Sequence, residues 1–389
     1  MSDDHALKAI SAYGKASLIQ TPNIDRIANE GALFTKGFVT NSICAPSRAA
    51  MLTGKHSFVN GKIDNMQAFD WDQDNFAKSL QANGYETALI GKIHLDGQPQ
   101  GFDYSDVLHD QGHYYNPDLI HNGDTVRHTG YVTKIITDKA LNWLDKTRDK
   151  KKPFCMLYHH KAPHRNWHPE PKYHDLYKDT TFMPPASFFN PTQNRGQAAK
   201  SAEMMIEKHM DWGHDFKLLH APNGSPTRFS EELDRFTPEQ REEWVAHYGP
   251  LNEQFHQDKL SGKELAIWKY NRYIKDYLKV IKSVDDQVGR VLDYLDEQGL
   301  ADNTIVVYTS DQGFYLGENG WFDKRFMYEE SFRTPILMRY PKMIPAKSKV
   351  DQLVQNIDFA PTFLEMANVD VPDDIQGKSL VSLFENPKQ

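Results

Sequence analysis

The sequence predicts an α/β protein with a mainly parallel central sheet between layers of helices. Short apolar runs of strand length recur along the chain, and patterns typical of amphipathic helices lie between several of them. Strands that alternate with helices in this way favour a parallel sheet covered on both faces. The length of 389 residues allows one large domain or two unequal lobes.

The predicted elements follow one another in this alternating order. A first helix is expected over residues 21–31, because Thr21 can cap it, Pro22 suits its first position and Gly31 follows its end. Another helix is expected over Tyr131–Leu144. Aromatic, aliphatic and β-branched runs predict strands at Ala32–Val39, Thr87–Ile90, Phe154–Tyr158, Thr304–Thr309 and Pro335–Tyr340.

The strongest single element is a helix over residues 261–298. Ser261 and Glu264 match a capping box, and Gly299 lies just past the expected end. Apolar side chains keep a spacing of three to four residues along one face, from Ile267 to Leu295. We expect this face to pack into the core and the helix to lead directly into the strand that follows it.

Residues 165–260 differ from the rest of the chain. They are rich in Pro, Asn, Gln, His and Trp, and their periodicity is weak except around Pro238–His247. We interpret them as an elaborated insertion of loops and helices laid over the sheet. Such an insertion often shapes a substrate pocket, and a plain surface excursion is the alternative.

Composition excludes several classes of protein. The formal net charge of −8 argues against a general nucleic-acid binder, but a few focused cations could still hold an anionic substrate. With Cys44 and Cys155 as the only cysteines, the chain has neither a disulfide framework nor a thiolate metal site. No run of 18 apolar residues predicts a membrane span. The opening residues lack a secretory signal pattern, which leaves the compartment open.

The most specific motif surrounds Cys44. A bare cysteine would be interpreted as a small buried hydrophobe, or as a thiol with a lowered pKa at a helix start. Here, however, Cys-x-Pro-Ser-Arg precedes a run of small residues and Thr-Gly, and this pattern resembles the signature of the type I sulfatases of the alkaline phosphatase superfamily. The resemblance implies that a formylglycine-generating or anaerobic sulfatase-maturating enzyme converts Cys44 to Cα-formylglycine. It also implies that Arg48 lies beside this residue and holds its hydrate.

The hydrated aldehyde explains why such a modification is useful. It carries two hydroxyls on one carbon, so one of them can attack sulfur and displace the alcohol. Deprotonation of the other then releases sulfate and regenerates the aldehyde. The resemblance therefore implies a sulfuric ester hydrolase whose nucleophile derives from residue 44.

Two acidic motifs match the metal motifs of the same family. One is Ser-Asp-Asp-His at residues 2–5, and the other is Ser-Asp-Gln-Gly at 310–313, directly after a predicted strand. Carboxylates at the carboxyl ends of parallel strands converge at one edge of a sheet. Oxygen ligands suit calcium and disfavour zinc. The resemblance implies one calcium ion held by Asp3, Asp4, Cys44 in its modified form, Asp311 and Gln312.

Further motifs supply cations and histidines. Gly-Lys-Ile-His-Leu contains Lys92 and His94, which alternation places on one side of an extended segment. By resemblance, Lys92 and Lys324 hold sulfate oxygens. One of His94 and His164 protonates the leaving alcohol while the other assists the formylglycine, and we favour His164 as the acid only slightly.

The resemblance also points to a substrate class. It extends from Asp3 to Leu383, and several stretches look like carbohydrate sulfatases, closest to bacterial enzymes similar to N-acetylglucosamine-6-sulfatase that act on glycosaminoglycan fragments. Candidate contacts to a sugar or its carboxylate are Arg165, Arg325, Trp167, Trp212 and Trp321. Two alternatives stay open: a formylglycine-dependent phosphonate or phosphate ester hydrolase, and a non-catalytic carbohydrate-binding remnant.

Both ends of the chain depart from the family pattern. Family members have an apolar strand before the paired aspartates, whereas Asp3 here closely follows Met1. After Leu380 the family continues into a small antiparallel subdomain, whereas this sequence stops at Gln389. We therefore expect residues 1–389 to form a single sulfatase catalytic domain that lacks the first strand and that subdomain. We also expect the paired aspartates to lie on a loosely held terminus, with poor folding or weak calcium binding as the result.

Overall fold

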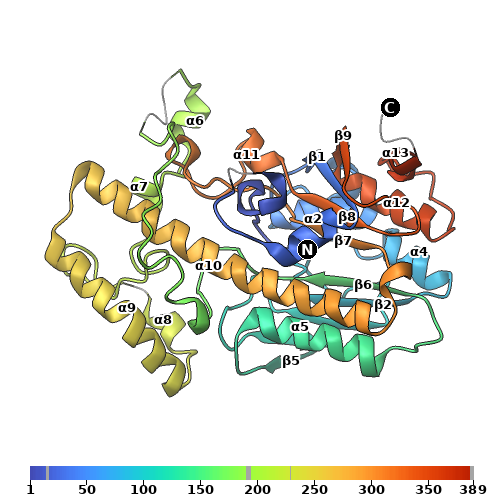
Figure 1. Cartoon of the computed structure of the whole chain (residues 1–389), viewed down its shortest axis with the longest axis horizontal. Coiled ribbons are helices and arrows are strands. Elements are labelled where there is room, and N and C mark those ends of the chain that lie inside the picture. The colour runs from blue at the N-terminus through green and yellow to red at the C-terminus, as the bar shows by residue number, and fades with distance from the viewer. Residues whose placement is uncertain (15–16, 190–193, 228, 386–389) are drawn as a thin grey trace.

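The computed structural model describes residues 1–14, 17–189, 194–227 and 229–385, which form two β-sheets surrounded by helices (Figure 1). One sheet has the strand order β7-β8-β1-β9, and the other has the order β5-β4-β3-β2-β6. The strands of the first sheet are β1 (Ala32–Phe38), β7 (Val306–Thr309), β8 (Ile336–Arg339) and β9 (Ser348–Gln355). Those of the second are β2 (Glu86–Gly91), β3 (Tyr104–Leu108), β4 (Asp118–His121), β5 (Asp124–Arg127) and β6 (Phe154–His159).

The predicted α/β class is confirmed, but the sheets are mixed rather than mainly parallel. Parallel pairs are β1–β9, β2–β3 and β2–β6, whereas β7–β8, β1–β8, β3–β4 and β4–β5 are antiparallel. For the β4–β5 pair, the physical reason is the short connection. A tight turn such as the one between β4 and β5 can join only antiparallel neighbours, because a parallel pair needs a long crossover.

The first residues of the chain connect the two sheets. The Met1 amino group donates to the carbonyl oxygen of Tyr158 in β6 at 2.8 Å, and the Ser2 N–H donates to that of Thr309 in β7 at 3.0 Å. The two aspartates that follow are almost fully buried. The expectation that they lie on a loosely held terminus is therefore wrong, because hydrogen bonds to strands of both sheets hold the segment.

The predicted long helix is confirmed as α10 (Gly262–Glu297), which packs against α1 (Pro22–Asn29) and α5 (Val132–Asn142). Its apolar face is buried, whereas the Ser261 side chain makes no capping hydrogen bond, so the expected capping box is wrong. Among the described residues, no helix combines the length and apolar character needed to cross a bilayer.

The remaining helices are all shorter than α10, and α9 is the longest of them. They are α2 (Cys44–Thr53), α3 (Ser57–Asn60), α4 (Phe76–Ala82), α6 (Gln197–Ser201), α7 (Ile206–His209), α8 (Ser230–Leu233), α9 (Pro238–Asp258), α11 (Glu329–Phe332), α12 (Phe359–Met366) and α13 (Val381–Glu385). Short 3₁₀ turns cover Leu7–Ala9, Ser11–Tyr13, Pro171–Tyr173, Ala301–Asn303, Glu318–Gly320 and Asn356–Asp358, and a π turn covers Trp143–Thr147.

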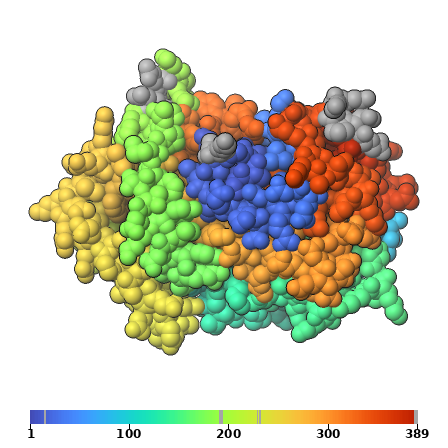
Figure 2. All heavy atoms as spheres, viewed as in Figure 1, coloured from blue at the N-terminus to red at the C-terminus, as the bar shows by residue number. Residues whose placement is uncertain are grey.

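The predicted insertion at 165–260 contains α6 to α9 and, with the first half of α10, forms one end of the molecule (Figures 1 and 2). Residues 190–193 and 228 of this segment lie outside the described residues. Trp167 and Trp321 are buried, and the Trp167 ring lies 4.7 Å from that of Tyr273 in α10. The prediction that these two tryptophans contact a sugar is therefore wrong, because both are covered by protein; Trp212 is only partly buried.

Helix α1 receives its N-terminal cap from a distant part of the chain. The Thr21 side chain, expected to be the cap, makes no capping hydrogen bond. Asp285 of α10 instead accepts the N–H groups of Asn23 and Ile24 at 3.0 and 2.9 Å. A buried carboxylate at a helix N-terminus satisfies two otherwise unpaired donors and interacts favourably with the helix dipole.

We expect Asp285→Ala to lower the free energy of unfolding by about 0.5–2 kcal/mol, the range for losing a helix cap. Urea unfolding monitored by circular dichroism measures the change. Asp293→Ala is the control, because Asp293 also links α10 to α1, through Arg26, but its side chain is exposed. A loss no larger than that of the control would contradict the capping role.

Candidate active site

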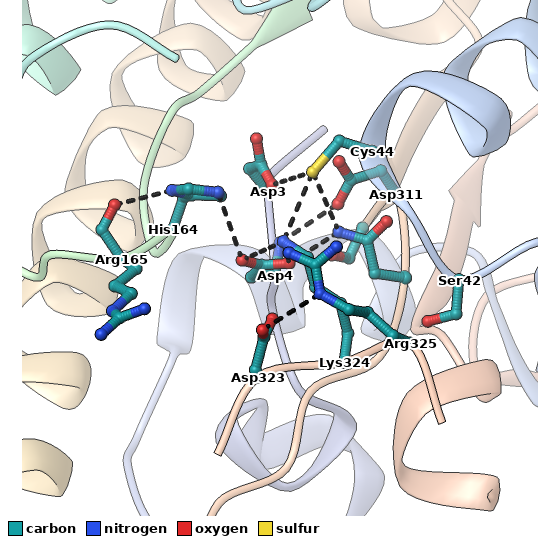
Figure 3. A network of polar contacts seen from close by, with 12 residues as sticks. Asp3, Asp4, Ser42, Cys44, His164, Arg165, Asp311, Asp323, Lys324 and Arg325 are labelled. Atoms are coloured by element: carbon teal, nitrogen blue, oxygen red, sulfur yellow. Dashed lines mark hydrogen bonds and ion pairs between the residues drawn. The ribbon is translucent and has the colours of Figure 1, made fainter. Parts of the chain in front are cut away.

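Cys44 is the first residue of α2, a helix whose ten residues are all buried. Gly54 ends this helix with a left-handed φ of 66°, a conformation that costs glycine little. The Cys44 sulfur lies 3.5 Å from Asp3 Oδ1, 3.4 Å from Lys324 Nζ and 3.7 Å from Gln312 Nε2 (Figure 3). The buried start of α2 therefore directs residue 44 at a group of charged side chains.

The unmodified thiol is poorly suited to attack. Burial, with a smaller effect of Asp3, raises the pKa of the Cys44 thiol to about 12. The thiol therefore stays protonated at neutral pH, and a protonated thiol is a weak nucleophile.

Three buried carboxylates face this sulfur. Oxygen atoms of Asp3, Asp4 and Asp311 all lie within 4.8 Å of one another. The Asp4 N–H donates to Asp311 Oδ1 at 3.1 Å, which links the N-terminal segment to the loop after β7. Burial raises the pKa of Asp4 to about 7, and burial together with Asp3 raises that of Asp311. Burial also acts to raise the pKa of Asp3, but Lys92 and the other nearby cations hold it well below its usual value.

These residues fit a hard divalent cation. Gln312 Nε2 donates to Asp4 Oδ1 at 2.6 Å, whereas Gln312 Oε1 is buried and has no hydrogen-bond partner among the described residues. A buried acceptor without a partner costs free energy unless a donor or an ion binds to it. A free amide oxygen beside three carboxylates is an all-oxygen donor set of the kind that calcium prefers.

Arg48 lies one turn along α2 and points at the carboxylates. Its Nε and Nη2 atoms contact Asp311 Oδ2 at 3.0 and 2.9 Å, and Nη2 lies 3.3 Å from Asp3 Oδ2. Nη1 donates to the Lys92 carbonyl oxygen at 2.6 Å. The guanidinium thus neutralises two buried carboxylates and joins them to the segment after β2.

Two lysines approach the same carboxylates from different loops. Lys324 Nζ donates to both Asp4 oxygens at 2.6 and 2.7 Å, and Lys92 Nζ contacts Asp3 Oδ2. Lys92 also donates to Gln111 Oε1 at 2.5 Å. The structure therefore brings both predicted sulfate-binding lysines to the carboxylate cluster around residue 44.

The two predicted histidines have different neighbours. His164 Nδ1 lies 2.6 Å from the Arg165 carbonyl oxygen and must donate to it, which leaves Nε2 3.8 Å from Asp4 Oδ2. His94 instead contacts Gln111. Burial, followed by Lys92, lowers the pKa of His94 to about 3 and that of His164 well below its usual value.

Each of the two predicted arginines pairs with an aspartate, and one of these, Asp215, lies outside every motif recognised in the sequence. Arg165 Nε and Nη2 donate to the carboxylate of Asp215 at 2.6 and 2.5 Å. Arg325 Nε donates to Asp323 Oδ2 at 3.2 Å, and its side chain is half exposed (Figure 3). No local sequence pattern predicts that Asp215 pairs with Arg165. The two residues are 50 positions apart, and Asp215 lies in the irregular segment between α7 and α8.

Comparisons with known proteins agree on one family. A family model described as sulfatase matches residues 1–369. The N-acetylglucosamine-6-O-sulfatase of Bacteroides thetaiotaomicron is 49% identical over 99% of this chain and 70% of its own length. A solved structure in complex with its substrate D-glucosamine-2-N,6-O-disulfate has a TM-score of 0.95 and 49% identity, covering 99% of this chain and 79% of that one. The phosphonate monoester hydrolase of Silicibacter pomeroyi shares the fold, with a TM-score of 0.67 and 18% identity over 99% of this chain and 75% of its own.

Proposed function

Because the chain belongs to the sulfatase family, we propose that it removes the 6-O-sulfate from N-acetylated or N-sulfated glucosamine in glycosaminoglycan fragments. The chain is a sulfuric ester hydrolase of the alkaline phosphatase-like fold. The observation that carries the substrate proposal is the 49% identity over nearly the whole chain to an N-acetylglucosamine-6-O-sulfatase. The solved relative in complex with D-glucosamine-2-N,6-O-disulfate supports it.

In this proposal Cys44 is the precursor of the nucleophile. A maturation enzyme converts it to Cα-formylglycine, whose hydrate supplies an attacking hydroxyl and a second hydroxyl for the release of sulfate. Lys92 and Lys324 hold the sulfate oxygens, and both already lie beside the carboxylates next to residue 44. Their fixed positive charge stabilises the negative charge that develops during sulfate transfer.

Of the two histidines, we assign the acid role to His164. Its Nδ1–H is held by the Arg165 carbonyl oxygen, so Nε2 is the atom free to exchange a proton. In this assignment His164 acts as the imidazolium, a form that the negative charge of the bound sulfate ester favours, and Nε2 gives its proton to the leaving alcohol oxygen while Nδ1 keeps its own. His94, which contacts Gln111, assists residue 44. Arg48 holds Asp3 and Asp311 in place through the contacts described above.

The carboxylate cluster is the proposed calcium site. Asp3, Asp4, Asp311 and the free amide oxygen of Gln312 would hold one ion together with modified residue 44. When bound, calcium offsets the charge of these carboxylates and of the sulfate group. Arg165 and Arg325 flank the site in Figure 3 and are the proposed contacts to the sugar.

The substrate proposal is tested with protein co-expressed with a maturation enzyme. The panel contains N-acetylglucosamine-6-sulfate, D-glucosamine-2-N,6-O-disulfate, N-acetylgalactosamine-4-sulfate, and aryl sulfate, phosphate and phosphonate esters. We expect kcat/KM for the two 6-sulfated glucosamines to exceed that for the 4-sulfate by about 100-fold or more, a difference of about 2.7 kcal/mol in transition-state binding. Faster hydrolysis of the phosphonate than of every sulfate would instead favour the alternative hydrolase.

A further inference from the structure

Asp4 adopts a backbone conformation that is uncommon for a residue with a side chain. Its φ of 65° lies in the left-handed region, which Gly, Asn and Asp occupy more readily than other residues. A residue persists in this region when the surrounding structure holds it there, and such residues gather at functional sites. Asp4 is buried, so contacts with other parts of the protein must hold this turn in place.

The segment after β7 holds one side of the turn. The Asp4 N–H donates to Asp311 Oδ1 at 3.1 Å, and the His5 N–H donates to Ser310 Oγ at 2.8 Å. Both acceptors belong to the segment that carries the second acidic motif. These two contacts pair the N–H groups of the turn, and the Asp4 carbonyl oxygen takes its partner from a different element.

The hydroxyl of Tyr277 in α10 holds the other side. It donates to the Asp4 carbonyl oxygen at 2.7 Å and accepts from the Ala6 N–H at 2.8 Å. The direction of both hydrogen bonds is fixed, because a carbonyl oxygen can only accept and a backbone N–H can only donate. One hydroxyl therefore pairs two backbone groups of the turn, and it gives its only proton to Asp4.

The ring of Tyr277 fixes the position of this hydroxyl. It is fully buried and stacks on the ring of Phe314, with the centroids 5.8 Å apart and the planes at 11°. Phe314 follows Gln312 by two residues, so the ring packs on the segment that carries another proposed calcium ligand. Tyr277 thus contacts the chain on both sides of the proposed calcium site, and it does so from a long helix packed into the core.

The position of the Asp4 carboxylate depends on this turn. Lys324 Nζ donates to both of its oxygens at 2.6 and 2.7 Å, and Gln312 Nε2 donates to Oδ1 at 2.6 Å. A change in the backbone angles of Asp4 would rotate its Cα–Cβ bond and move the whole carboxylate. Without the bond to its carbonyl oxygen, the turn could relax toward commoner backbone angles, and the carboxylate would leave the oxygen set.

We infer that Tyr277 is a positioning residue for the calcium site, whose hydroxyl holds Asp4 in the left-handed turn that directs its carboxylate. This inference rests on the calcium site of the proposed function. Loss of a group that orients a metal ligand typically lowers metal affinity by about 10- to 100-fold. Tyr277→Phe is the sharpest change, because it removes the hydroxyl and keeps the ring that packs on Phe314.

The first measurement is calcium titration by calorimetry of full-length protein, co-expressed with a maturation enzyme and then treated with chelator. We expect Tyr277→Phe to raise the Kd for calcium by about 10- to 100-fold. Tyr273→Phe is the matched control, because it removes an equally buried hydroxyl one turn earlier in α10, where the acceptor is the Tyr315 carbonyl oxygen at 2.9 Å. Its Kd should stay within about threefold of wild type.

Two outcomes of this titration would overturn the inference. One is equal calcium affinity of wild type and Tyr277→Phe. The other is an equal loss of affinity in Tyr277→Phe and Tyr273→Phe, which would mean that any lost hydroxyl in α10 weakens the site through stability alone. A wild type that bound no calcium would refute the proposed calcium site itself, and the positioning role with it.

The second measurement follows the turn without calcium. Hydrogen exchange of chelator-treated protein, detected by mass spectrometry of the N-terminal peptide, reports on the Ala6 N–H that Tyr277 accepts. We expect this N–H to exchange about tenfold faster in Tyr277→Phe and at the wild-type rate in Tyr273→Phe. Unchanged exchange in Tyr277→Phe would show that the turn is held without the hydroxyl, and would overturn the inference while leaving the proposed calcium site in place.

Discussion

Cys44→Ala is expected to lower kcat/KM for N-acetylglucosamine-6-sulfate by at least about 10⁴-fold, the scale seen when a covalent nucleophile is removed. The alanine side chain can be neither oxidised to an aldehyde nor hydrated. The fold should survive, because the start of α2 is also held by the Ser47 N–H bond to the Ile43 carbonyl oxygen at 2.9 Å and by the Ala45 N–H bond to Asn65 Oδ1 at 3.1 Å. Sulfate release from protein co-expressed with a maturation enzyme is the measurement.

Cys155→Ala is the matched control, since Cys155 is the other cysteine and lies within β6, away from the described site contacts. It should keep wild-type activity within a few-fold. Mass spectrometry of the Cys44 peptide from active wild-type protein should show a loss of about 18 Da, the change from a thiol-bearing side chain to an aldehyde. Full activity in protein whose Cys44 peptide keeps the mass of cysteine would contradict the proposed nucleophile.

Asp311→Asn should have the second-largest effect, a loss of about 10³-fold or more in kcat/KM together with loss of calcium binding. Asp311 accepts from Arg48 and from the Asp4 N–H, so the change removes a charge at the point where the N-terminal segment meets the loop after β7. Removing one partner of a buried ion pair also destabilises the fold, by roughly 3 kcal/mol. Calcium titration of chelator-treated protein by calorimetry measures the binding directly.

The melting temperature gives a readout that does not depend on activity. A ligand that binds only the folded state raises the melting temperature of the wild type. Calcium should therefore stabilise chelator-treated wild type and leave Asp311→Asn unchanged. Asp285→Ala is the control, because it lowers stability at a site in α10 that caps α1 and should keep the full calcium-induced rise. If calcium raised the melting temperature of wild type and Asp311→Asn equally, Asp311 would be excluded as a calcium ligand.

Strands with a continuous apolar or β-branched run were predictable, whereas strands without such a run were not. The predicted strands correspond to β1, β2, β6, β7 and β8, each within two residues at either end. Strands β3, β4, β5 and β9 were not predicted. Strand β5 is exposed along its whole length and β9 alternates between buried and exposed positions, so neither carries the apolar run that identifies a buried strand.

The sequence by itself determined the kind of chemistry. The cysteine motif, the acidic motifs and the lysine and histidine motifs are local patterns, and each is recognisable within a few residues. The structure then brings Cys44, Lys92, His164, Lys324 and the three carboxylates to one place, as these motifs predict. Their catalytic roles stay predictions that the experiments above address.

Only the tertiary structure decided which partner each side chain meets. Arg48 faces the carboxylates, Asp215 holds Arg165, and Gln111 lies between Lys92 and His94. Trp167 belongs to the core and not to a sugar-binding surface. The physical reason is that a local motif specifies backbone conformation and chemical type. Contacts between residues far apart in the chain depend instead on strand order and on which loops leave the sheet at the same edge.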